Sequence, residues 1–118
     1  MKKQLALLGF VLLSPSFSLA SEGLDSLEIQ RVVRTNLNQV QHCYNQLQAV
    51  NSKAKGKIKV NFTIAPTGLV SKVGIAEDTI GDAKFGECLI GKIMRWRFPA
   101  PRGGKEFSTT YPFTLTPK

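Results

Sequence analysis

The sequence predicts an α+β fold in which two helices pack against a three-stranded antiparallel sheet, in the order α-β-β-α-β. Apolar residues recur at helical spacing in residues 25–47 and again in residues 82–95. Residues 56–65, 69–76 and 107–115 instead alternate between apolar and polar side chains, as strands with one solvated face do. Proline and glycine residues lie between these segments, where turns are needed.

The first helix is expected to begin at Asp25, because Glu28 follows three residues later and completes the pattern of a capping box. One amphipathic helix of about 20 residues follows, with a single buried stripe and a polar opposite side. The stripe consists of apolar residues at helical spacing: Ile29, Val33, Leu37, Val40, Tyr44 and Leu47.

Residues 56–65 predict a strand with an apolar face of Ile58, Val60, Phe62 and Ile64 and a polar opposite face. Pro66-Thr67-Gly68 supplies a turn, because proline presets φ and glycine accepts a positive φ. The short link makes residues 69–76 the second strand of an antiparallel hairpin. Its expected shared face consists of Leu69, Ser71, Val73 and Ile75.

Asp82 is placed to cap the second helix, which Pro99 and Pro101 bring to an end. Gly86 and Gly91 each weaken this helix by up to about 1 kcal/mol relative to alanine. We expect these glycines to permit close contact with a neighbouring element.

Trp96 and Phe98 lie at the end of the second helix, and two roles are open to them. An aromatic pair there can fill the space between helix and sheet, as a structural plug, or it can form a platform on which a ligand stacks. The plug is the interpretation we favour.

Residues 1–20 have the pattern of a secretory signal peptide that is cleaved after Ala20. Lys2 and Lys3 form the basic region, residues 5–13 form the apolar region, and Ser18 and Ala20 are the small residues of the cleavage site. An uncleaved anchor is the alternative, but the apolar stretch is shorter than the roughly 20 residues that span a bilayer. We therefore expect residues 21–118 to form a single domain in the periplasm or outside the cell, without a stable membrane anchor.

Cys43 and Cys88 are the two cysteines of the chain. In an oxidising compartment, an even cysteine count predicts a structural disulfide, which here would join the two helices. The alternative is a redox pair that exchanges disulfides. The chain has no C-x-x-C motif, and both cysteines lie beside apolar core positions, where thiols are poorly activated.

The chain carries 16 basic and 8 acidic residues, and loss of the two signal-peptide lysines leaves a net charge of +6. Lysines at every second position enter the first strand. They and an arginine are candidate contacts for an anionic envelope polymer such as peptidoglycan or lipid phosphates: Lys53, Lys55, Lys57, Lys59 and Arg102. The alternative is a solvated face that keeps a small domain soluble. Nucleic acid is not an expected partner of an exported chain.

No constellation of catalytic residues is evident in the sequence. His42 is the sole histidine and has no carboxylate nearby in the sequence. Glu77, Asp78 and Asp82 gather in one loop, but their spacing does not match an EF-hand. Phosphate-binding loops and nucleophile motifs are absent from the sequence. We expect no enzyme activity, no metal site and no cofactor.

The order of these elements and several motifs resemble the TonB-like C-terminal domain, specifically the AgmX/PglI C-terminal type found in envelope and gliding-motility proteins. The resemblance covers residues 27–115 and is carried by Cys43-Tyr44, Gly56-x-Ile58-x-Val60-x-Phe62-x-Ile64, Pro66-x-Gly68-x-Val70, Cys88, Trp96-Arg97-Phe98-Pro99 and Tyr111-Pro112-Phe113. It implies a three-stranded sheet packed on helices, in a domain that contacts envelope proteins. TonB-class proteins transmit inner-membrane energy to outer-membrane transporters, which offer a short peptide to the sheet edge. This chain shows no proline-rich spacer, so only the binding role is carried over.

The third strand is expected at an edge of the sheet, because the first strand lies between its hairpin partner and the returning chain. Its alternating residues Phe107, Thr109, Tyr111 and Phe113 are the candidate partner-binding site, where an extended peptide would add. Pro112 fits an edge, where it is tolerated, and alternatively blunts that edge against aggregation. The expected function is non-catalytic binding of an outer-membrane or periplasmic protein segment, and the alternative is binding of the anionic polymer.

Overall fold

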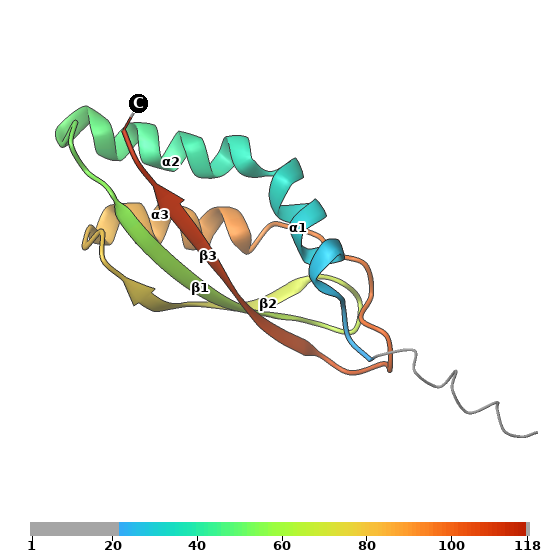
Figure 1. The fold of residues 1–118 in the computed structure, drawn as a ribbon. Coiled ribbons are helices and arrows are strands. Elements are labelled where there is room, and N and C mark those ends of the chain that lie inside the picture. Colours follow the sequence, from blue (N-terminus) through green and yellow to red (C-terminus); the bar gives the residue numbers. More distant parts are fainter. Residues whose placement is uncertain (1–21, 118) are drawn as a thin grey trace, which may run out of the picture.

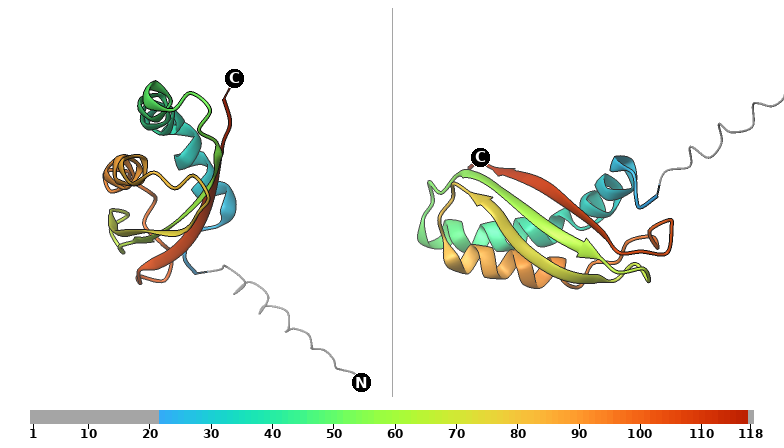
Figure 2. Two further views of the ribbon diagram at one scale, coloured as in Figure 1. Left: turned by 90° about the vertical axis from the view of Figure 1, so that its left-hand side faces the viewer. Right: turned by 90° about the horizontal axis from the view of Figure 1, so that it is seen from below.

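The computed structural model describes residues 22–117 (Figure 1). Within them lie the helices α1 (Ser26–Thr35), α2 (Leu37–Val50) and α3 (Ala83–Ile93) and the strands β1 (Gly56–Ile64), β2 (Val70–Asp78) and β3 (Phe107–Leu115). The strands form an antiparallel sheet in the order β2-β1-β3. Figure 2 shows α2 and α3 together on one face of this sheet. The predicted α+β class and antiparallel sheet are confirmed, while the predicted signal peptide lies outside the described residues.

The single helix expected from residue 25 to residue 47 is divided into α1 and α2 at Asn36, so this part of the prediction was wrong. The Asn36 side-chain amide donates a hydrogen bond of 2.8 Å to the carbonyl oxygen of Val32. One residue earlier, the Thr35 hydroxyl donates to the carbonyl oxygen of Arg31 at 2.9 Å. Both side-chain types compete with the backbone for hydrogen bonds and therefore favour a helix end.

Strand β1 forms the centre of the core, and its apolar face is fully buried as predicted. Strand β2 departs from the expected alternation, because the pairing with β1 shifts at two places and leaves Ser71 and Ala76 as extra residues. Val70 is therefore buried, whereas Leu69 is exposed. The expected face of Leu69 and Ser71 with Val73 and Ile75 was wrong, since each bulge changes which residues face the core.

Helix α3 begins as predicted, with the Asp82 carboxylate accepting a hydrogen bond of 2.8 Å from the backbone N–H of Phe85. A disulfide between Cys43 and Cys88 joins α2 to α3, so the predicted pairing is confirmed. The bond has a buried side, because Cys43 is only 1% exposed.

The chain after α3 inserts two aromatic side chains into the core. Trp96 is 2% exposed, and its indole N–H donates to the side-chain oxygen of Gln39 at 2.9 Å. Phe98 stacks on Phe62 of the central strand, with ring centroids 5.4 Å apart. Both rings therefore fill space between the helix layer and the sheet.

The β1–β2 turn requires a glycine at position 68 for two reasons. Its φ is +95°, which L side chains rarely adopt, and a Cβ there would overlap the carbonyl oxygen of Phe98. Gly86 and Gly91 differ, because a Cβ on either would meet no atom within 4 Å outside its own stretch of helix. The expectation that these two glycines permit a close contact was wrong.

Candidate functional site

Strand β3 lies at an edge of the sheet, as expected, and its backbone is regularly arranged. It pairs with β1 over nine consecutive residue pairs without a register shift, and Pro112 lies opposite Lys59. Because proline has no N–H, this pair cannot be one of the mutually hydrogen-bonded pairs, which alternate along an antiparallel ladder. The backbone groups of Tyr111 and Phe113 therefore point toward β1, and those of Thr110 point away from the sheet.

The edge of β3 consequently presents an alternating set of backbone groups to a partner. Ser108, Thr110 and Thr114 each direct an N–H and a C=O outward, while Pro112 directs only a C=O outward. The sequence interpretation named the neighbouring residues instead. The position of Pro112 could have identified these residues, because it determines which alternate residues face the edge.

The opposite edge, formed by β2, is less suited to pairing. Its two extra residues, Ser71 and Ala76, interrupt the ladder, and bulges of this kind bend a strand and increase its twist. Natural sheets use bulges to prevent edge-to-edge association. Of the two edges, β3 is therefore the regular one.

The side chains expected to contact a partner lie mainly against the core. Phe113 is 5% exposed and its ring lies 5.1 Å from that of Tyr111, while Phe107, Thr109 and Tyr111 are half-buried. All four point to the helix-covered side of the sheet. What they leave accessible to a partner is the backbone edge and a strip of half-buried side chains next to it.

A depression lies between α2 and the chain that follows β3. It has a volume of about 260 Å³ and is lined by Gln41, Tyr44, Asn45, Gln48 and Thr116. Tyr44 is buried, and its hydroxyl donates to the carbonyl oxygen of Ala54 at 2.5 Å. Sequence reasoning did not single out these amides as a site.

The structure brings together only part of the proposed anionic contact set. Lys55, Lys57 and Lys59 line one shallow depression of about 570 Å³ on the helix-free face of the sheet. The ammonium of Lys59 lies 3.1 Å from a Glu77 carboxylate oxygen. Lys53 is exposed in the preceding loop.

Arg102 is separated from these lysines by the length of the sheet. It precedes Phe107, which pairs with the last residue of β1, whereas Lys57 lies near the first residue. Its guanidinium donates to both carboxylate oxygens of Glu28, at 2.8 and 3.2 Å. This pairing lowers the pKa of Glu28 to about 2, with the backbone N–H of Asp25 as the second cause. Arg102 thus links the loop before β3 to the N-terminus of α1.

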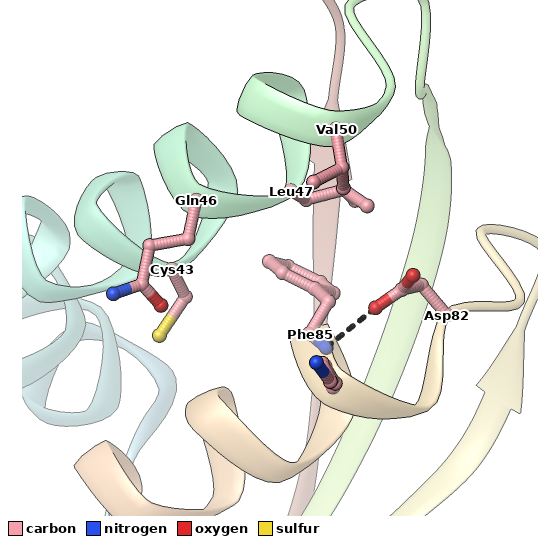
Figure 3. A pocket seen from close by; sticks show the side chains of 7 residues that line it. Cys43, Gln46, Leu47, Val50, Asp82 and Phe85 are labelled. Carbon is pink, nitrogen blue, oxygen red and sulfur yellow. Dashed lines mark hydrogen bonds between the residues drawn. The ribbon is translucent and has the colours of Figure 1, made fainter.

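A third depression, the hollow beside the disulfide, lies between α2 and α3 (Figure 3). It measures about 270 Å³ and is lined by Cys43, Gln46, Leu47, Val50, Asp82, Lys84 and Phe85. Asp82 is engaged in capping α3 there. His42 is exposed on α2, and its ring Nε2 lies 3.3 Å from the side-chain Nε2 of Gln46. Nowhere in residues 22–117 do three or more histidine, cysteine or carboxylate side chains gather as metal ligands would.

Residues 22–117 thus form an α+β domain with one regular sheet edge that none of the described strands covers, and an amide-lined depression lies beside this edge. None of the helices described is long and apolar enough to cross a membrane.

No family model matches the chain, and no curated protein does. Among solved structures, the chain is similar to the NMR solution structure of the Helicobacter pylori TonB-CTD, residues 179–285. The TM-score is 0.42 and the identity 17%, and the alignment covers 83% of this chain and 98% of that one. A similarity at this level carries no argument about function.

Proposed function

We propose that this chain is a non-catalytic protein-binding domain of the TonB-like AgmX/PglI C-terminal type, located in the periplasm or secreted. A signal peptide of residues 1–20 would be removed, and residues 21–118 would form the domain. It would bind an extended segment of an outer-membrane or periplasmic protein by adding that segment as a fourth strand beside β3. The observation that carries this proposal is the unbroken register of β3 at an open edge.

Strand addition draws its affinity from backbone hydrogen bonds and its specificity from the alternate side chains of the added segment. Ser108, Thr110 and Thr114 supply outward N–H and C=O groups for such bonds. Pro112 withholds one N–H, so a partner forms one ladder bond fewer there. This loss weakens binding without preventing it.

Substitution at Thr110 tests the proposal, because proline and alanine there differ in the outward N–H. Thr110→Pro removes the N–H from the edge and leaves the ladder with β1 intact, whereas Thr110→Ala removes only the side chain. Peptides from envelope fractions should shift the amide signals of β3 in the native protein and in Thr110→Ala. Thr110→Pro should bind about two- to tenfold more weakly, because it loses one hydrogen bond to the added segment.

Two results would refute strand addition at β3. One is the absence of any β3 shift with every envelope fraction. The other is equal binding by Thr110→Pro and the native protein while both remain folded, as judged by unchanged signals from β1 and β2.

Binding of an anionic envelope polymer is the second candidate, and the clustering of Lys55, Lys57 and Lys59 around one depression favours it. An electrostatic contact weakens as salt rises, because ions screen exposed charges over about 10 Å at 0.1 M. Co-sedimentation with peptidoglycan sacculi at low and high salt measures this.

Two double variants with the same net charge distinguish binding at the lysine depression from a general effect of positive charge. Lys55→Gln/Lys57→Gln should lose retention on sacculi. Lys84→Gln/Lys105→Gln, at exposed positions elsewhere, should keep it. Equal retention by both variants, or retention that salt does not change, would exclude this second function.

A further inference from the structure

Helix α2 and strand β3 carry no charged residue, although charged residues make up 20% of the chain and its net charge is +8. Surface helices ordinarily place charged residues on their exposed side. In α2 that side carries His42 and six amides instead: Asn38, Gln39, Gln41, Asn45, Gln46 and Gln48. The exposed side chains of β3 are likewise uncharged hydroxyls and a proline.

Five of these six amides can be assigned to one of two flanks of α2. Gln39 and Gln46 lie on the flank toward α3, where Gln39 accepts from Trp96 and Gln46 lines the hollow beside the disulfide. Gln41, Asn45 and Gln48 line the depression at the end of β3. Figures 1 and 2 agree that the end of β3 lies beside α2 and that α3 lies nearer to β2.

The amides on the β3 flank retain hydrogen-bonding capacity. The Gln48 side chain is half-buried, and its amide has no hydrogen-bond partner among residues 22–117. The Gln41 side-chain N–H donates to the side-chain oxygen of Asn45 at 2.8 Å, which uses only one group of each amide. An amide has two donor hydrogens and an acceptor oxygen, so both residues can bind a further polar group.

We propose that the segment added to β3 is uncharged and rich in Asn, Gln, Ser or Thr, and that Gln41, Asn45 and Gln48 hydrogen-bond its inward-facing side chains. This inference rests on the proposed strand addition. In an added strand, every second side chain points to the helix-covered side, and those beside the end of β3, where Thr116 lines the depression, lie next to α2. A charged side chain at this depression would lose water without gaining an opposite charge, because none of the residues that line it is charged. Neutral amides and hydroxyls would have their hydrogen bonds satisfied.

Synthetic peptides of the length of β3, blocked at both ends, test this on the full oxidised protein. One is neutral, with alternating Val and Gln, and two others carry Glu or Lys at the Gln positions. The neutral peptide should shift the β3 amide signals with an affinity that salt hardly changes. The Glu and Lys peptides should bind at least tenfold more weakly.

A matched pair of variants locates the recognition on α2. Gln48→Ala should weaken binding of the neutral peptide by about two- to tenfold, as expected for one lost hydrogen bond. Gln46→Ala changes the same residue type on the other flank and should leave the affinity unchanged.

The outcomes separate the two proposals. If the neutral peptide shifts β3 but Gln48→Ala binds it as well as Gln46→Ala does, strand addition stands and the inference about α2 is wrong. Preference for the Glu or Lys peptide likewise overturns the inference. If no peptide shifts β3, both proposals fail. Shifts of β3 that depend on protein concentration without peptide would identify a second copy of the chain as the occupant and overturn the peptide proposal.

Discussion

Removal of the disulfide should destabilise this domain by a large and calculable amount. Cys43 and Cys88 are 45 residues apart in the sequence. In the loop-entropy description, a closed loop of that size restricts the unfolded chain by about 4 kcal/mol at 25 °C. Domains of about this size lose roughly 4–8 °C of melting temperature per kcal/mol, so melting should fall by about 15–30 °C.

The measurement is urea and thermal unfolding of three samples: the oxidised protein, the reduced protein, and Cys43→Ala/Cys88→Ala. The reduced protein is the matched control, because it keeps both cysteine side chains and loses only the bond. It should lose about 4 kcal/mol, and the double variant somewhat more, since truncation at buried Cys43 also removes a packed sulfur. A loss below about 1 kcal/mol on reduction would refute the loop argument. It would also revive the alternative of a disulfide-exchange pair, which predicts a folded protein of nearly unchanged stability.

Three further predictions concern single residues. Gly68→Ala should destabilise the domain, because its φ of +95° and the adjoining carbonyl exclude a Cβ, whereas Gly91→Ala should stabilise it by up to about 1 kcal/mol in chemical unfolding; equal effects would contradict both assignments. Gln39→Ala should cost about 1–3 kcal/mol by leaving the buried Trp96 indole N–H without a partner. Unfolding measurements would show this cost, and unchanged stability would contradict it. The pKa of Glu28 is lowered from its ordinary 4.5 to about 2. The contribution of its carboxylate to folding stability is therefore present above about pH 4.5 and is lost as pH falls toward 2. Glu28→Gln should therefore remove the part of the stability that disappears in this window, and an unchanged pH profile would contradict it.

The elements of this fold could largely be predicted from the sequence, because each depends on local patterning. The alternation of β1 predicted a strand with one buried face, the order of the strands predicted its central position, and the cysteine count predicted the link between helices. The helix break at Asn36 was missed because the apolar periodicity continues across it, from Val33 to Val40. The bulges of β2 were missed because they depend on pairing with β1, which periodicity does not record.

The candidate site was predictable to a smaller extent. Pro112 indicated an edge strand, and its missing N–H also implies that the backbone groups of Thr110 and its alternate neighbours face outward, in agreement with the register with β1. The pattern of α2 shows which amides are exposed. It separates Gln46 from Gln48, which are two residues apart on the helix, but it does not show which flank faces α3 and which faces β3, because that depends on how Cys43 is tied to α3. Tertiary placement, absent from any local pattern, therefore decides which amides can serve as a site.

The two proposed surfaces adjoin each other and should differ in their response to salt. Lys57 lies opposite Thr114 in the sheet, so the lysine depression begins where the outward edge of β3 ends. Binding through the uncharged amides of α2 should hardly change with ionic strength, whereas binding through exposed lysines should weaken as screening increases. A segment that follows β3 to its end and also approaches Lys57 would show a small salt dependence, which Lys57→Gln removes while the shifts at Thr110 remain. A large salt dependence at Thr110 itself would mean that charge governs the edge, and the division between a neutral and a basic surface would then be wrong.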